Sequence, residues 1–318
     1  MHDSRHASPS LRYLALFTAL LTWFLILIGG IVHGTGSSLA CPDWPTCYGS
    51  FFPEMKGGIF FEHSHRLVAA LTGLLTVILC ILLLRQGKGA LKKAGVAAAA
   101  LVIFQGILGG ITVIYRLPTA VSTAHLATSM IFLCLVSGIA FACFPLRFPV
   151  SCESLRGLKA WLLPTLILVY LQIVLGALVR HTGAGLACLD IPLCRGSLWP
   201  EGAPPILQVH MLHRLAGALV GLVVLATSWR AYRASEGFPA LRFMAVAAPF
   251  LVLLQIGLGL WSVHSALGLF PVTAHLGVGA LLLVVFFLMN LGVILARRGT
   301  AGGEARGAVA EGLRPSTV

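Results

Sequence analysis

The sequence FEHSHRL at residues 61–67 has a counterpart, VHMLHRL, at residues 209–215, and each copy leads into a long apolar run. A second motif, TAHL, stands at residues 123–126 and again at residues 273–276. Three further pairs of segments match in the same order: GGIVHGTG at 29–36 with GALVRHTG at 176–183, LACPD at 39–43 with LACLD at 186–190, and CYGS at 47–50 with CRGS at 194–197. Since order and spacing recur, the chain is a tandem duplication.

The composition is that of a membrane protein. Hydrophobic residues make up 58% of the chain and charged residues only 10%, with a mean hydropathy of +0.94. Soluble domains carry about 25% charged residues. Apolar runs of about 20 residues, enough to cross a bilayer, are expected at 13–32, 65–84, 94–114, 121–142, 160–179, 208–229, 242–263 and 272–296. Because backbone polar groups need internal partners in hydrocarbon, each run is predicted to be a helix, which makes the fold all-α, polytopic and eight-spanning.

Each half contains four spans, an even number, so the two copies share one orientation in the membrane. We therefore predict two tandem four-helix bundles. The expected division is an N-terminal arm at 1–12, a first bundle at 13–143, a linker at 144–159, a second bundle at 160–296 and a disordered tail at 297–318.

The net charge of +12 reports orientation in the membrane. Of the 22 Lys and Arg residues, 16 fall in the two terminal segments and in the second, fourth and sixth connections, all on one side of the apolar runs. The positive-inside rule makes that side cytoplasmic and places both termini there. This distribution argues against a nucleic-acid partner and for the lipid bilayer.

Four matched histidines are the strongest candidates for chemistry: His65, His125, His213 and His275. Each falls near the start of a span that begins outside, so all four are expected at similar depth near the outer face. Polar residues at membrane depth are costly and usually functional. A neutral imidazole is a good iron ligand, and helix bundles bind haem between facing side chains. We expect each half to ligate one haem through its two histidines.

Two other interpretations of these histidines were weighed. Interfacial histidines bonded to water or backbone would explain one position, but less readily four in register. Zinc is disfavoured because each half offers only two aligned histidines. Arg66 and Arg214, which follow His65 and His213 directly, are candidate partners of the haem propionates, since Arg presents a fork of donors.

The two halves differ at Glu62, three residues before His65, where the second half has His210. A carboxylate at this place could be a solvated group at a helix N-terminus, which the helix dipole favours. It could also lie over a bound substrate and take up a proton or stabilise positive charge. The asymmetry suggests that one half performs chemistry and the other holds a permanent cofactor.

Two cysteine pairs lie in outer loops, Cys41 with Cys47 and Cys188 with Cys194. The extracytoplasmic side is oxidising, so disulfides are plausible there. Each pair could be a structural clip or a thiol pair that relays electrons. The other four cysteines, in or inside the membrane, are expected to be inert: Cys80, Cys134, Cys143 and Cys152.

At these positions the sequence resembles the haem A synthase family. The resemblance rests on EHSHR at 62–66, TAHL at 123–126 and 273–276, HRL at 213–215 and the loop of Cys41 and Cys47, and it covers about residues 13–296. It implies oxidation of a methyl group of haem O to a formyl group by successive hydroxylations, with oxygen from water, to make haem A for terminal oxidases.

The resemblance also implies roles for individual residues. His65 and His125 would flank substrate haem, Glu62 would be the catalytic carboxylate, and His213 and His275 would ligate a resident haem b. Cys41 and Cys47 would form a disulfide linked to activity. Many members lack the second cysteine pair, which leaves the role of Cys188 and Cys194 open.

The implied location is the bacterial cell (inner) membrane, with the haem sites near its extracytoplasmic side. Suggested partners are haem O synthase and terminal oxidase assembly factors, and a homo-oligomer is left open.

Two rival functions stay open at this point. A dihaem b-type electron carrier or quinol oxidoreductase would use the same histidine pairs but would not explain why only one half has Glu62. A transporter would fit the duplication, but the matching spans carry no paired Gly/Pro interruption at mid-membrane.

Overall fold

The computed structural model describes residues 7–145, 155 and 157–312. This part of the chain contains eight long α-helices: α1 (Pro9–Gly34), α2 (Gly57–Gln86), α3 (Ala90–Ile114), α4 (Thr119–Cys143), α5 (Lys159–His181), α6 (Pro205–Arg233), α7 (Pro239–His264) and α8 (Leu269–Gly312). A short 3₁₀ helix, η2 (Ala184–Leu186), precedes α6. All eight α-helices are long and apolar enough to cross a membrane. The predicted all-α, eight-span fold is confirmed.

All eight helices begin earlier than the predicted apolar runs, and α2 does so by the most. Helix α2 starts at Gly57 where residue 65 was predicted, and α6 starts at Pro205 where 208 was predicted. Hydropathy cannot detect these first turns because they carry polar side chains such as Glu62 and His63. As a result His65 lies about two turns inside α2 rather than at its start.

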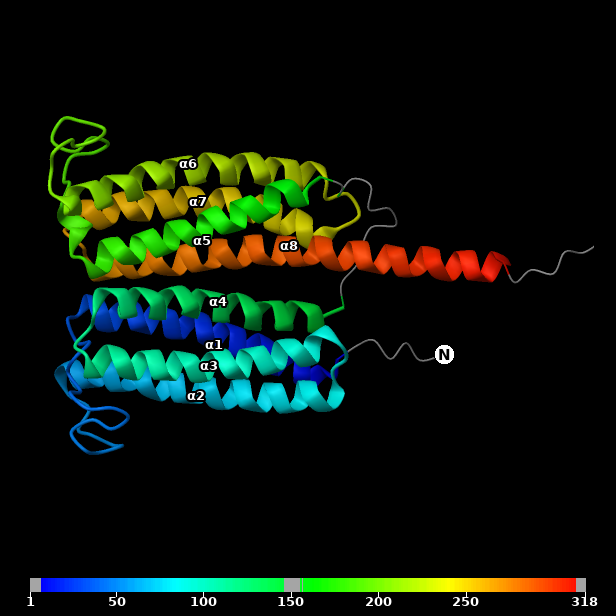
Figure 1. Ribbon diagram of the computed structural model, residues 1–318, viewed down its shortest axis with the longest axis horizontal. Helices are drawn as coiled ribbons and strands as arrows, with labels where there is room; N and C mark the ends of the chain where they lie inside the picture. Colours follow the sequence, from blue (N-terminus) through cyan, green and yellow to red (C-terminus); the bar gives the residue numbers. More distant parts are fainter. Residues whose placement is uncertain (1–6, 146–154, 156, 313–318) are drawn as a thin grey trace, which may run out of the picture.

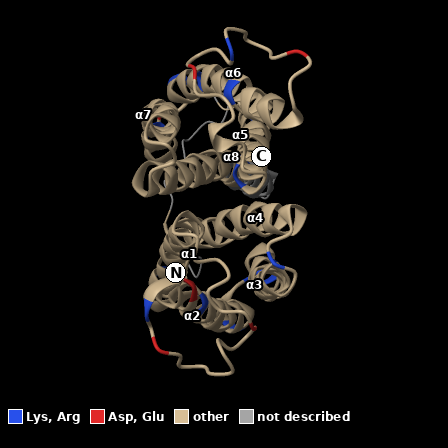
Figure 2. Ribbon diagram, turned by 90° about the vertical axis from the view of Figure 1, so that its left-hand side faces the viewer, with Lys and Arg blue, Asp and Glu red and all other residues tan. Residues whose placement is uncertain are grey.

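Within each half the four helices contact one another in a ring. Helix α1 packs on α2 and α4, with α3 between them, and α5 packs on α6 and α8, with α7 between them. Figure 2, which looks along the helices, shows the two groups one above the other. The halves meet at three helix pairs (Figure 1): α4 contacts α8, α4 contacts α5, and α1 contacts α8.

The interface between halves explains why α4 and α8 are the most enclosed helices. Their most apolar windows are 61% and 50% buried, against 22–33% for the other six. Polar groups contribute at this interface, since the Trp23 indole N–H donates to the Gly277 carbonyl at 3.0 Å and the Tyr170 hydroxyl to the Ala127 carbonyl at 3.3 Å. The remaining helices leave their apolar side chains facing outwards, as a lipid-facing surface requires.

The start of α1 and the far end of α8 lie at the same end of the molecule, opposite the two long loops (Figure 1). The cytoplasmic location of that end stays a prediction. Helix α8 is drawn as far as Gly312, and the expected disorder of the tail from residue 297 stays a prediction.

Some predictions fall on residues that the structure does not describe. They include Cys152, residues 1–6 of the arm, 146–154 and 156 of the linker, and 313–318 of the tail. Cys80, Cys134 and Cys143 are buried free cysteines.

Candidate haem sites

Each of the four histidines packs against a glycine on the preceding helix. The pairs are Gly29 with His65, Gly109 with His125, Gly176 with His213, and Gly259 with His275. A Cβ added to these glycines would lie 3.2, 3.6, 3.0 and 3.0 Å from the histidine Cε1 atom, in that order. The four glycines occupy matching places in the two halves. A helix without a side chain at this point leaves room for an imidazole ring between the two backbones.

In the second half the rings of His213 and His275 face each other across the bundle. Their centroids are 6.4 Å apart and their planes are inclined by 76°. Two metal–imidazole bonds of about 2.0 Å on opposite sides of one ion, with about 1.2 Å from each nitrogen to its ring centre, would separate the centroids by about 6.4 Å. The observed spacing therefore fits two axial ligands of one metal centre. In the first half, His65 and His125 are close enough for their charges to interact.

Glutamine side chains orient three of the four rings. The Gln172 amide nitrogen lies 3.0 Å from His213 Nδ1 and donates to the His213 carbonyl at 2.8 Å. Gln255 lies 3.4 Å from His275 Nε2 through its amide nitrogen. Gln105, with its amide nitrogen towards the ring, donates to His125 Nδ1 at 3.0 Å.

His65 differs from the other three. Leu25 stands on α1 at the place that Gln172 occupies on α5, so no amide faces the His65 ring. His65 Nδ1 is buried and has no hydrogen-bond partner among the described residues. At the His65 ring, α1 therefore offers only the backbone of Leu25 where α5 offers the side-chain amide of Gln172 to His213.

The polar atoms around the rings fit a bound porphyrin iron. His275 Nδ1 lies 3.0 Å from the backbone carbonyl of Gln255, which can only accept, so Nδ1 donates and Nε2, which lies 3.4 Å from the Gln255 amide nitrogen, is the acceptor of the ring. Several buried polar atoms nearby lack a partner in the described part of the chain, namely His65 Nδ1, Thr123 Oγ1, Gln172 Oε1, Gln255 Oε1 and Thr273 Oγ1. Buried polar groups without partners are rare in native proteins and call for a missing group.

Glu62 is buried, with 4% of its surface exposed, so it is not a solvated carboxylate at a helix N-terminus. Its Oε2 accepts from the backbone N–H of Cys41 at 2.8 Å, and its Oε1 accepts from Arg66 Nη2 at 2.7 Å. The carboxylate thus lies between the outer loop and the turn that carries His65. In the second half His210 takes this place, and its Nδ1 accepts from the N–H of Cys188 at 3.3 Å.

Arg66 and Arg214 hold the outer loops. Arg66 Nη1 donates to the carbonyls of Asp43 at 2.7 Å and Thr46 at 2.6 Å, and Nη2 donates to that of Cys41 at 3.2 Å as well as to Glu62. These four bonds can use all N–H groups except the one on Nε. Arg214 likewise donates to the carbonyls of Asp190 and Cys188. Sequence reasoning assigned both arginines to propionates and did not detect the loop contacts.

Both cysteine pairs form disulfides in the structure, with S–S distances of 2.04 Å for Cys41–Cys47 and 1.99 Å for Cys188–Cys194. A tight turn follows each pair, and in the first the Cys47 N–H donates to the Ser50 carbonyl at 2.9 Å. The Asp43 carboxylate accepts from the Thr46 hydroxyl and from the N–H groups of Gly49 and Tyr48. These bonds lower the pKa of Asp43 to about 2.

The comparisons with known proteins identify the family of the chain. The model of the cytochrome oxidase assembly protein family (COX15-CtaA) matches residues 12–58 and 52–287, which is most of the chain. The chain belongs to this family. A protein named "Heme A synthase" from Halalkalibacterium halodurans is 30% identical over 297 residues, covering 91% of this chain and 98% of its own. A protein of the same name from Shouchella clausii is 30% identical, covering 91% of this chain and 97% of its own. Another from Geobacillus kaustophilus is 31% identical, covering 84% of this chain and 86% of its own.

A second polar group lies between the halves of this cytochrome oxidase assembly family member. The rings of His33 on α1 and His181 on α5 stack with centroids 5.2 Å apart. Arg180 adjoins the pair, and in the part of the chain that the structure describes its guanidinium has no hydrogen-bond or ion-pair partner. The sequence alone does not reveal this pair, because no spacing in it shows that α1 and α5 end side by side.

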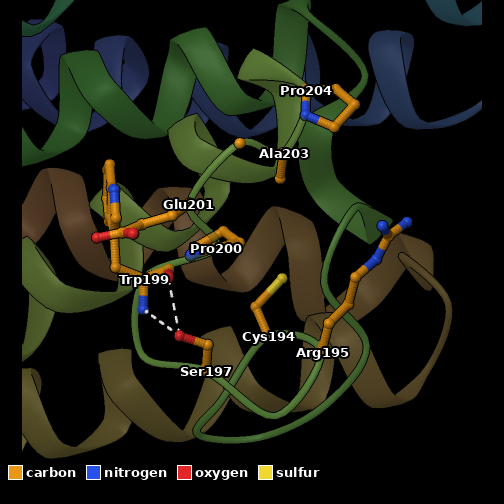
Figure 3. A pocket seen from close by; sticks show the side chains of 9 residues that line it. Cys194, Arg195, Ser197, Trp199, Pro200, Glu201, Ala203 and Pro204 are labelled. Atoms are coloured by element: carbon orange, nitrogen blue, oxygen red, sulfur yellow. Dashed lines mark hydrogen bonds between the residues drawn. The ribbon is translucent and has the colours of Figure 1, made fainter.

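Figure 3 shows a hollow on the surface of the second outer loop, lined by residues from Cys194 to Pro204. Ser197 shapes it, since its hydroxyl donates to the Trp199 carbonyl at 2.8 Å and accepts from the Trp199 N–H at 3.2 Å. None of the four histidines lines this hollow, so it is separate from the candidate haem sites.

The contacts of Arg66 predict a measurable effect on the first loop. Arg66→Lys keeps the charge but loses the fork of donors, so we expect backbone amides of residues 41–50 to exchange hydrogen at least about tenfold faster. One hydrogen bond to a charged group contributes about 1.5–3 kcal/mol, enough for such a change. Arg85→Lys, an exposed change on the same helix, is the control. Equal exchange in both variants, measured by mass spectrometry, would mean that Arg66 does not hold the loop.

Proposed function

We propose that the chain is a haem A synthase, which oxidises one methyl group of haem O to a formyl group by successive hydroxylations. The observation that carries the proposal is a pair of histidines in each half, every ring set against a glycine, with the buried carboxylate of Glu62 beside only one pair. The relatives named "Heme A synthase" that align with 91% of the chain support it.

The second half is the proposed site of the resident haem b, bound by His213 and His275. Both rings have a glutamine neighbour, and with their centroids 6.4 Å apart these two residues would hold the haem if it binds between them. Firmly oriented ligands favour a cofactor that stays bound. When bound, haem b supplies an acceptor for the electrons removed from the methyl carbon.

The first half is the proposed substrate site, with haem O between His65 and His125. Its ring at position 65 has no amide neighbour, which suits a porphyrin that must leave as product. Glu62 is the proposed catalytic carboxylate, because removal of hydrogen from the methyl group releases protons that a buried carboxylate can take up. Arg66 orients that carboxylate at 2.7 Å and fixes it beside the first loop.

Propionates carry two negative charges that need partners at the polar rim of the site. Arg66 retains only its Nε–H for this task, and the Arg214 Nε–H already donates to His210 at 3.2 Å. Arg180, whose guanidinium has no partner among the described residues, is the third candidate, and we propose it as a propionate contact next to the His33–His181 pair.

We propose a bacterial cell membrane as the location, with the loops, disulfides and haem sites on the extracytoplasmic side and both termini in the cytoplasm. The support is the distribution of Lys and Arg, which collects at the end of the molecule away from the disulfide loops.

The test is to extract pigments from a host that makes haem O but no haem A, with and without this chain, and to separate the haems by chromatography. We expect haem A to appear only with the chain. A dihaem electron carrier would leave haem O unchanged, and that result would replace the proposed synthase by its rival.

The glycine contacts predict an effect on haem b binding. In Gly259→Ala the new Cβ would lie 3.0 Å from His275 Cε1, so the ring must move; overpacking of this kind costs about 1–3 kcal/mol, or roughly 5- to 150-fold in haem b affinity. Gly257→Ala, two residues away on α7, meets nothing within 4 Å and should bind haem b normally. Equal haem b content and spectra in the two purified variants would contradict the assignment.

A further inference from the structure

The first outer loop places a histidine beside its disulfide. The sulfur atoms of Cys41 and Cys47 and one ring nitrogen of His63 all lie within 4.8 Å of one another. All three residues are buried, with 0%, 0% and 4% of their surface exposed. Two sulfur ligands and one imidazole thus share a small enclosed volume that solvent does not enter freely.

The hydrogen bonding of His63 leaves one ring nitrogen free. His63 Nε2 lies 3.0 Å from the backbone carbonyl of Phe51, and because a carbonyl only accepts, Nε2 carries the hydrogen. Nδ1 therefore keeps its lone pair, yet it is buried and has no hydrogen-bond partner in the described chain. A ring that donates to a backbone carbonyl through one nitrogen and keeps the other free has the arrangement typical of a metal-ligating histidine.

The second loop shows that this arrangement does not follow from the loop fold itself. The loop of Cys188 and Cys194 has the same disulfide and the same turn, but Met211 stands where the first loop has His63. Met211 is fully buried and packs against both cysteines. An apolar residue fills the position well, so the imidazole in the first loop is not needed for packing.

We propose that Cys41, Cys47 and His63 form a redox-gated zinc site in the first outer loop. A reductant must first open the disulfide: with a phosphine, two electrons pass from phosphorus to the sulfurs, water supplies oxygen for the phosphine oxide, and two thiols result. Zn²⁺ then binds two thiolates and His63 Nδ1, and two protons are released. Two Cys and one His are a known zinc donor set, with the fourth position left for water.

This site adjoins the proposed substrate half, but its metal binding can be measured without haem chemistry. The site adjoins Glu62 in two ways: the Cys41 N–H donates to the Glu62 carboxylate, and His63 is the next residue after Glu62 in α2. The test below measures metal content and needs no haem A formation, so its failure would leave the proposed synthase function untouched.

The experiment uses the full-length chain in detergent, oxidised or reduced with a phosphine, dialysed against buffered Zn²⁺ and analysed for bound metal by atomic emission. We expect reduction to add one Zn²⁺ per chain. His63→Met should abolish this gain by weakening binding more than about 100-fold, since even outer contacts of a metal ligand change affinity by 10–100-fold. The reciprocal Met211→His should add a second reduction-dependent Zn²⁺.

The paired variants keep the proposal falsifiable if one of them folds poorly, and the Soret spectrum reports whether the haem-binding fold is intact. Zinc uptake that does not depend on reduction, or that is unchanged in His63→Met, would overturn the site. Uptake of Cu⁺ without Zn²⁺ by the reduced chain would overturn the assignment to zinc.

Discussion

Replacing Glu62 by histidine is expected to leave haem b bound and to lower haem A formation by about 10²–10⁴-fold, the usual loss for a general acid or base. The change copies the second half, where one ring nitrogen of His210 lies 3.3 Å from the Cys188 nitrogen and the other lies 3.2 Å from Arg214 Nε, and a neutral ring accepts one of these two bonds. The loop contacts of residue 62 can therefore persist while the carboxylate disappears. The measurement is haem A per purified chain, with haem b read from the pyridine haemochrome spectrum.

The matched control is His210→Glu, which puts a carboxylate in the second half and leaves Glu62 in place. We expect it to retain haem A formation, because the substrate half is unchanged. Normal haem A in Glu62→His would remove the catalytic assignment of Glu62. Loss of both haems in Glu62→His would show that the carboxylate serves folding instead.

His213→Ala is expected to lose the resident haem b and, with it, haem A formation. An iron ligand contributes directly to the affinity for haem b. Alanine would also leave a void beside Gly176, because the His213 ring packs against this glycine. The b-type absorbance of the purified variant should fall to the level of the first half alone.

His65→Ala provides the comparison, since it removes the equivalent ligand of the substrate half. We expect it to keep the b-type spectrum and to accumulate no haem A. If His65→Ala loses the b-type spectrum and His213→Ala keeps it, the proposed assignment of the two halves is reversed. Thermal unfolding of both variants shows whether the bundle itself is intact.

The sequence predicts the eight helices well because hydrocarbon leaves an apolar run no other way to satisfy its backbone. It also singles out the four histidines, because the duplication repeats them. It cannot show which glycine faces which histidine, since that depends on the rotation of each helix about its axis. A Cβ on Gly259 would meet His275, whereas a Cβ on Gly257 would meet no described atom within 4 Å, although both residues lie on α7 two residues apart.

Arg66 illustrates a different limit. A charge at the membrane rim next to a ligand histidine suggested a propionate partner. The structure instead folds the loop back over α2, so that the carbonyls of Asp43 and Thr46 come within 2.7 Å of the guanidinium. The disulfide and the turn after it set this path, and neither has a signature in hydropathy.

The absence of a glutamine at position 25 bears on how long each porphyrin stays bound. A neutral hydrogen bond contributes about 1 kcal/mol, which alters a dissociation rate roughly fivefold. A half that lacks one such hydrogen bond at its ligand histidine releases its haem sooner, and turnover requires that release. On the proposed assignment, the shorter residence time falls to the half that must release its haem as product.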